Sequence, residues 1–237
     1  SFTGGATTGR HLSSFSTMKP MVLELGGKDP AIVCEDADID QAVTEIMSGA
    51  YSYSGQRCTA IKRVLVNEAV ADELAAKLKV EVEALSVGMP IDNPVIVPLI
   101  NKGSADYVDG LITDTIKDGA TLLVGNKRED NLIYPTLFDH VTTDMRLAWE
   151  EPFGPVLPII RVKSDEEAIQ IANQSEYGLQ ASVFSRNFSR AVAIAGKIEA
   201  GSVQINGRTE RGPDHFPFLG VKNSGMGVHG ISKTIDA

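Results

Sequence analysis

The stretch VLPIIRVKSDEEAIQIANQSEYGLQASVF, residues 156–184, decides the fold class. Residues 156–162 are mostly apolar and predict a buried strand in spite of Pro158, and residues 181–184 predict a second strand. Between them, residues 165–173 predict a helix. A strand, a helix and a second strand in this order are typical of the units that build parallel sheets.

The same alternation extends along the rest of the chain. Further strands are expected over residues 21–25, 31–34, 64–66, 121–124 and 202–205. Further helices are expected over residues 41–49, 69–85, 107–117 and 189–199. Asp38 or Asp40 could cap the first of these helices. The sequence therefore predicts an α/β fold with a mostly parallel sheet flanked by helices.

Composition and charge exclude several classes of protein. Of the 237 residues, 43% are hydrophobic and 22% are charged, which is typical of a folded globular protein. The net charge of -9 argues against a general attraction to nucleic acid or to anionic membranes, so we expect neither as a partner. No apolar run approaches the roughly 18 residues of a membrane-spanning helix. Any anion must therefore meet a local cluster of positive charge.

The two cysteines indicate a reducing compartment, and we expect a cytoplasmic location. Cys34 lies in an apolar run and is expected to be structural. Cys58 follows Arg57 in a polar turn that contains Gly55, where positive charge and backbone N–H groups would favour a thiolate. Cys58 is thus either a nucleophile or another structural cysteine. We expect no metal site, because no histidine stands at ligand spacing from another.

Glu24 is the second candidate for chemistry. It stands in an apolar run just before Gly26 and Gly27. An exposed strand face is the commoner arrangement for such a carboxylate. Burial would instead raise its pKa and make it a general base at neutral pH.

Three further segments could bind a ligand or could simply be exposed loops. The corner at residues 150–155 could hold a ribose through a glutamate, with Phe153 beside it. Residues 1–9, rich in glycine and small hydroxyl residues, are a weak signal for phosphate binding at the start of a helix. Residues 208–216 contain two arginines that could grip an anion. The last 30 residues, rich in Gly, Pro and Asn, are expected to wrap over a site or another domain.

The order of these motifs resembles the aldehyde dehydrogenase superfamily. The motifs are Phe2-Thr3-Gly4-Gly5, Glu24-Leu25-Gly26-Gly27-Lys28, Gly55-Gln56-Arg57-Cys58 and Glu151-Pro152-Phe153-Gly154-Pro155. The interval of 34 residues from Glu24 to Cys58 is also similar to that of the superfamily. Residues 53–60, 149–158 and 211–220 further resemble the subfamily that oxidises glyceraldehyde 3-phosphate with NADP and without phosphorylation.

The resemblance implies a role for each residue. Cys58 would attack the aldehyde, and Glu24 would activate the water that hydrolyses the resulting thioester. Arg57 and Arg211 would grip the substrate phosphate, with Thr59 lining the same pocket. The residues expected to hold or border NADP, or NAD in its place, are Gly4, Gly5, Leu25, Glu151 and Phe153.

The resemblance also implies a division of the chain. Residues 1–24 would be the end of a cofactor-binding domain, residues 25–205 the catalytic domain, and residues 206–237 a segment that returns to the cofactor domain and lines the active site. Members of the superfamily are roughly twice as long, so the chain would be a poorly active portion of an enzyme that is a homo-oligomer, a tetramer in the family. Two alternatives stay open: a dehydrogenase for another anionic aldehyde such as a semialdehyde, and a non-catalytic binding or interaction fragment.

Overall fold

The computed structural model describes residues 1–230, and its largest sheet has seven strands. Their order across the sheet is β12 (Ser202–Ile205), β11 (Gln180–Phe184), β3 (Asp29–Val33), β4 (Ile61–Asn67), β9 (Val156–Val162), β8 (Thr136–Asp139) and β5 (Thr121–Val124). All neighbouring pairs are parallel except β5 and β8, which are antiparallel. The predicted α/β class with a mostly parallel sheet is confirmed.

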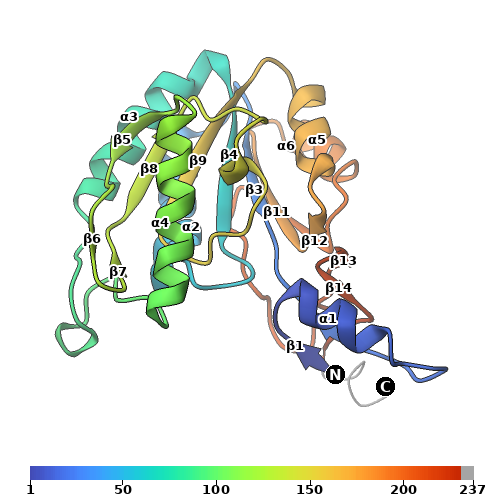
Figure 1. Cartoon of the computed structure of the whole chain (residues 1–237). Helices are drawn as coiled ribbons and strands as arrows, with labels where there is room; N and C mark the ends of the chain where they lie inside the picture. The colour runs from blue at the N-terminus through green and yellow to red at the C-terminus, as the bar shows by residue number, and fades with distance from the viewer. Residues whose placement is uncertain (231–237) are drawn as a thin grey trace.

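Helices cover both faces of this sheet (Figure 1). One face packs against α2 (Ile39–Tyr51) and α3 (Glu68–Glu83), and the other against α4 (Lys102–Lys117), α5 (Asp165–Gln174) and α6 (Phe188–Ala195). Successive side chains of a strand alternate between the faces, so Val64 and Val66 enter one core while Leu65 enters the other. Burial on both faces explains why each central strand contains a continuous apolar run.

Side-chain caps set where the helices begin. Of the two predicted caps for α2, Asp38 is the one observed, and its carboxylate accepts a hydrogen bond from the Gln41 N–H. Asn67, Asn101, Ser164 and Asn187 cap α3, α4, α5 and α6 in the same way. Each accepts an N–H that the first helical turn leaves unpaired.

A small three-stranded sheet stands apart from the large one. It joins β1 (Phe2–Thr3), β2 (Leu23–Glu24) and β14 (Gly225–Met226), with β2 in the middle. Helix α1 (Ala6–Ser13) follows β1, and both lie below the large sheet in Figure 1. The small sheet thus brings the first and the last described parts of the chain together.

The remaining elements are short. They are β6 (Arg128–Glu129), β7 (Leu132–Ile133), β10 (Tyr177–Gly178) and β13 (Val221–Lys222), and the 3₁₀ turns η1 (Ser52–Gly55), η2 (Pro90–Asp92) and η3 (Arg146–Ala148). Strand β6 pairs with β7, and β10 pairs with β13. The C-terminal segment contributes β13 and β14, each of which pairs with a distant part of the chain. Its last residues, 231–237, lie outside the described part.

Several predicted boundaries are wrong. The strand expected over 21–25 is reduced to two residues of the small sheet, Leu23–Glu24. Helix α4 begins at Lys102 rather than 107, since Asn101 caps it, and α6 ends at Ala195 with Gly196 as its C-cap. Strand β8 was not expected.

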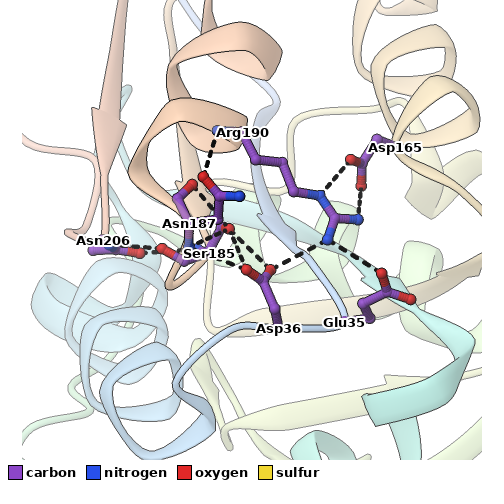
Figure 2. A network of polar contacts seen from close by, with 7 residues as sticks. All are labelled: Glu35, Asp36, Asp165, Ser185, Asn187, Arg190 and Asn206. Atoms are coloured by element: carbon purple, nitrogen blue, oxygen red, sulfur yellow. Dashed lines mark hydrogen bonds and ion pairs between the residues drawn. The ribbon is translucent and has the colours of Figure 1, made fainter.

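A polar network fixes the point where the chain leaves the large sheet after β12 (Figure 2). The Asn206 side chain exchanges two hydrogen bonds of 3.0 Å with the backbone of Ser185. The Ser185 hydroxyl donates to Asp36 at 2.9 Å. Arg190 lies between Asp36, at 3.4 Å, and Asp165, at 2.6 Å. The segment that begins at Asn206 therefore starts from a fixed position.

Candidate active site

One pocket of about 700 Å³ gathers almost all of the predicted site residues. It is lined by Thr3, Gly4, Gly5, Glu24, Leu25, Gly26, Gln56, Arg57, Cys58, Thr59, Glu151 and Phe153. These residues come from strands β1 and β2 of the small sheet and the turns that follow them, from the loop before β4, and from the corner before β9. Of the ten residues named from the sequence, Arg211 alone is not part of the lining.

A strained turn presents Cys58 to this pocket. Tyr53, Ser54 and Gly55 all have positive φ, of 55°, 56° and 68°. Glycine is required at the third position, because a Cβ on Gly55 would lie 2.3 Å from the carbonyl oxygen of Gly154. The Ser54 hydroxyl holds the turn by accepting the Val97 N–H at 2.9 Å. The unusual backbone directs the following loop, and with it Cys58, toward the pocket.

Cys58 is a free, half-buried thiol. Burial raises its pKa, and this outweighs the opposing charge of Lys62 and the N–H of Thr59. The expectation that the neighbouring charge would favour the thiolate is therefore corrected: burial outweighs that charge and favours the thiol. The cation that acts most strongly on the sulfur is Lys62 rather than the adjacent Arg57. Cys34 is free and fully buried, as a structural cysteine should be.

Glu24 is buried in the middle strand of the small sheet, with 6% of its surface exposed. Its carbonyl accepts the Gly4 N–H at 3.1 Å, and the next residue, Leu25, donates its N–H to Ser224 at 2.8 Å. Burial raises the pKa of Glu24 to about 7, against the opposing charge of Arg211. The exposed strand face that is commoner for such a residue is wrong here, because strands pair on both sides of β2. A carboxylate of this pKa suits a general base at neutral pH.

Glu151 is fixed by two elements at once. Its Oε1 accepts the Gly27 N–H at 3.0 Å and pairs with the Lys62 ammonium at 3.2 Å. A Cβ on Gly26 would lie 2.1 Å from Oε2, so the carboxylate fills the space that this glycine leaves. Lys62 was missed in the sequence. The available signal was a lysine four residues after Cys58, beside Arg63 and just before the apolar run of residues 64–66.

The same wall of the pocket fits a dinucleotide. Gly5 is the N-cap of α1, whose first N–H groups could receive a phosphate, and open space surrounds its Cα. Glu151 offers a carboxylate for ribose hydroxyls, and Phe153, 42% exposed, offers an aromatic face. The donors and acceptors present thus match a phosphate, a sugar and a flat ring.

Of the predicted substrate-binding residues, Arg57 and Thr59 line the pocket, whereas Arg211 does not. Arg57 donates to the Gly49 carbonyl at 2.8 Å, lies over the Tyr53 ring at 5.7 Å, and has a buried Nε without a partner in the described part. Thr59 is buried, and its carbonyl accepts the Thr209 hydroxyl at 2.6 Å. That bond ties the C-terminal segment to the loop of Cys58.

Arg211 lies further along the same segment. Its guanidinium pairs with Asp214 at 3.4 Å and lies over the Phe218 ring at 5.5 Å. It is close enough to Glu24 for its charge to lower that residue's pKa. The structure therefore does not bring Arg57 and Arg211 together on one pocket wall, and their joint grip on a phosphate stays a prediction.

Two features are absent from residues 1–230, a membrane-spanning helix and a cluster of metal-ligating side chains. Among residues 1–230, no helix has both the length and the apolar character needed to cross a membrane. Nor does that part of the chain contain a group of three or more His, Cys, Asp or Glu side chains arranged to hold a metal ion.

Comparison with known proteins shows the family of the chain. The sequence pattern of the aldehyde dehydrogenase family matches residues 1–237. The chain belongs to the aldehyde dehydrogenase family.

Within this family, the chain is similar to several NADP-dependent glyceraldehyde-3-phosphate dehydrogenases. The chain is 59% identical to an NADP-dependent glyceraldehyde-3-phosphate dehydrogenase of Streptococcus equinus and 53% identical to that of Pisum sativum, over 236 residues in each case. A crystal structure of the NADP-dependent glyceraldehyde-3-phosphate dehydrogenase of Bacillus halodurans complexed with NADP matches 99% of the chain with a TM-score of 0.97 and 60% identity. The chain spans 50%, 47% and 49% of these three proteins, about half of each.

Proposed function

We propose that the protein containing this chain oxidises glyceraldehyde 3-phosphate to 3-phosphoglycerate with NADP. The observation that carries the proposal is that Cys58, Glu24 and Glu151 line one pocket in a chain of the aldehyde dehydrogenase family. The names of its relatives support the substrate and the cofactor.

The residues divide the reaction into two halves. The Cys58 thiol first gives its proton to water, and the thiolate then attacks the aldehyde carbon, so that a carbon–sulfur bond forms while the carbonyl oxygen becomes an oxyanion. NADP, when bound, supplies the hydride acceptor that turns this adduct into a thioester. Glu24 then takes a proton from a water molecule whose oxygen attacks the thioester carbon. The carbon–sulfur bond breaks, which releases the acid and returns the Cys58 thiolate.

Glu151 and Phe153 position the cofactor in this proposal. Glu151 accepts hydrogen bonds from the nicotinamide ribose, and Phe153 packs beside the ring. Gly4, Gly5 and Leu25 border the remaining part of the cofactor. Binding by Glu151 favours a single orientation because Gly27 and Lys62 already hold its carboxylate.

Arg57 and Arg211 are proposed to bind the substrate phosphate. The unpartnered Nε of Arg57 supports this role, since a buried donor without an acceptor is costly. Arg211 would exchange Asp214 for the phosphate, and that ion pair is exposed and therefore weak. A dianion gains more from an arginine than a single exposed carboxylate does.

The test is a substrate panel on the full-length protein with Arg57→Ala and Arg211→Ala, singly and together. We expect kcat/KM for glyceraldehyde 3-phosphate to fall by about 10² or more in the double variant, and kcat/KM for an unphosphorylated aldehyde to change little. An equal fall on both substrates contradicts phosphate binding by these residues. Preference of the unmodified protein for a carboxylate semialdehyde would favour the alternative substrate class.

A second measurement distinguishes an enzyme from a non-catalytic fragment. If the site is formed, glyceraldehyde 3-phosphate protects Cys58 from alkylation. Unprotected alkylation at the rate of a free thiol would instead favour a binding or interaction module.

We also propose that the protein acts in the cytoplasm and that it is a homo-oligomer. We further propose that the chain divides after residues 24 and 205, with the catalytic domain between these two points. Two free cysteines support a reducing compartment. The separate small sheet, which contains residues on both sides of the proposed division, supports contact between the ends of the chain and a cofactor domain. Size-exclusion chromatography with light scattering on the native protein tests the oligomer, and cell fractionation tests the location.

A further inference from the structure

Lys62 lies at the junction of two parts of the site. It is the second residue of β4 and only 2% exposed. Its ammonium donates to the carbonyl oxygen of Cys58 and pairs with Glu151 Oε1 at 3.2 Å. One side chain therefore contacts both the nucleophile's own backbone and the carboxylate assigned to the ribose.

Its surroundings explain why a buried charge is tolerated there. An ammonium removed from water is costly unless charges and hydrogen bonds compensate it. Glu151 supplies the negative charge that pairs with the ammonium, whereas burial raises the pKa of the nearby Asp29, 1% exposed, to about 7. The cluster also contains Arg63 and Lys28, both fully buried, and burial lowers the pKa of Lys28 well below its usual range. Arg63, the next residue in β4, adds a like charge beside Lys62, and packing alone could be met by an apolar side chain.

We propose that Lys62 is a positioning residue that couples the nucleophile loop to the cofactor-binding carboxylate. By holding the Cys58 carbonyl and Glu151 with one ammonium, it fixes the distance between the attacking sulfur and the ribose. Its charge also favours the Cys58 thiolate over the thiol. The inference rests on the proposed function for the reaction that this geometry serves, whereas the contacts themselves do not depend on it.

The test compares Lys62→Met with the unmodified full-length protein in two readouts. The first is the rate of Cys58 alkylation by iodoacetamide against pH, with the modified peptide identified by mass spectrometry. The groups that act on this thiol are Lys62, Asp29 and Glu151, and Arg57 adjoins it. We expect the midpoint in Lys62→Met to move upward by about half to one pH unit, because the charge that most favours the thiolate is lost.

The second readout is NADPH affinity, measured by fluorescence. We expect about tenfold weaker binding in Lys62→Met, the effect of losing one charge-assisted hydrogen bond that orients Glu151. Lys62→Arg should recover most of both effects. Adding Lys62→Met to Glu151→Gln should weaken binding no further, because Lys62 acts on the cofactor through Glu151.

Lys28→Met is the matched control. Lys28 is equally buried, but its Nζ makes no hydrogen bond within residues 1–230. The Lys28→Met substitution should therefore leave the alkylation midpoint of Cys58 unchanged. If Lys62→Met does not fold, Lys62→Gln carries the same test, because its amide can still donate to the Cys58 carbonyl while the charge is gone.

Three results would overturn the inference. They are an unshifted alkylation midpoint and NADPH affinity in Lys62→Met, an equal midpoint shift in Lys28→Met, or losses that add in full when Lys62→Met and Glu151→Gln are combined. The proposed function fails separately, if the unmodified protein oxidises no aldehyde. The alkylation profile would still report on Lys62 in that case.

Discussion

Replacing Glu24 by glutamine tests the assignment of the general base. The carboxyl is 6% exposed, its Oε1 has no hydrogen-bond partner within residues 1–230, and burial raises its pKa to about 7. With that pKa, roughly one tenth of Glu24 is ionised at pH 6 and roughly nine tenths at pH 8. An ordinary glutamate would be almost fully ionised at both. Thioester hydrolysis in the unmodified enzyme should therefore rise about ninefold to tenfold between pH 6 and pH 8.

The assay is stopped-flow measurement of NADPH formation with the full-length enzyme at each pH. In Glu24→Gln the steady-state rate should fall by about 10² to 10⁴, and the contribution of this group to the pH dependence should vanish. A burst of about one NADPH per site should remain, because hydride transfer precedes the step that Glu24 serves. Hydrolysis in the unmodified enzyme that is flat from pH 6 to pH 8 would refute the reasoning, as would a variant with unchanged steady-state rate.

The same pKa shift has a consequence for stability, with a definite sign. A carboxyl whose folded pKa is raised binds its proton more tightly when folded, so its contribution to stability is complete below its ordinary value of 4.5. That contribution is lost as the pH rises through about 7, by at most about 3 kcal/mol. Urea unfolding should show this loss between pH 4.5 and pH 7 in the unmodified protein but not in Glu24→Gln.

Two further substitutions test how the site is supported. Gly26→Ala would place a Cβ 2.1 Å from Glu151 Oε2, so NADPH affinity by fluorescence titration should fall about tenfold, and unchanged affinity would show that this carboxylate is not confined as described. Arg63 is fully buried and donates to the Lys28 and Ala172 carbonyls at 3.1 and 3.0 Å, so Arg63→Met should lower the free energy of unfolding in urea by about 3 kcal/mol or more. The control Arg186→Met removes an exposed arginine and should change stability little; equal losses in both would contradict the role of burial.

The parts of the fold that the sequence predicts well are those buried on both faces. Strands β3, β4, β9 and β11 each contain an apolar run, and that run was recognised from composition. Strand β8 was missed because it is only four residues long and carries polar residues at both ends, Thr136 and Asp139. Its apolar centre is too short to distinguish a strand from a loop.

In the candidate site, too, some features were predictable from the sequence and others depend on the fold. Cys58 and Glu151 stand in recognisable motifs, and the structure places them on one pocket. The burial of Glu24 was not predictable from its neighbours, because it depends on pairing with β14, some 200 residues further along the chain. Lys62 was missed for a related reason: its partners are distant in sequence, and only the fold makes a buried lysine acceptable.

The small sheet also sets an order of assembly during synthesis. The Glu24 strand has one neighbour near the start of the chain and the other, β14, at Gly225–Met226. A ribosome adds residues one at a time, so the seven-stranded sheet can pair through Ile205 before β14 has been made. Cys58 would then be presented on a folded sheet while Glu24 still lacks one side of its surroundings. The nascent protein would thus possess its nucleophile before its base, and a thioester formed at that stage would have no route to hydrolysis through Glu24.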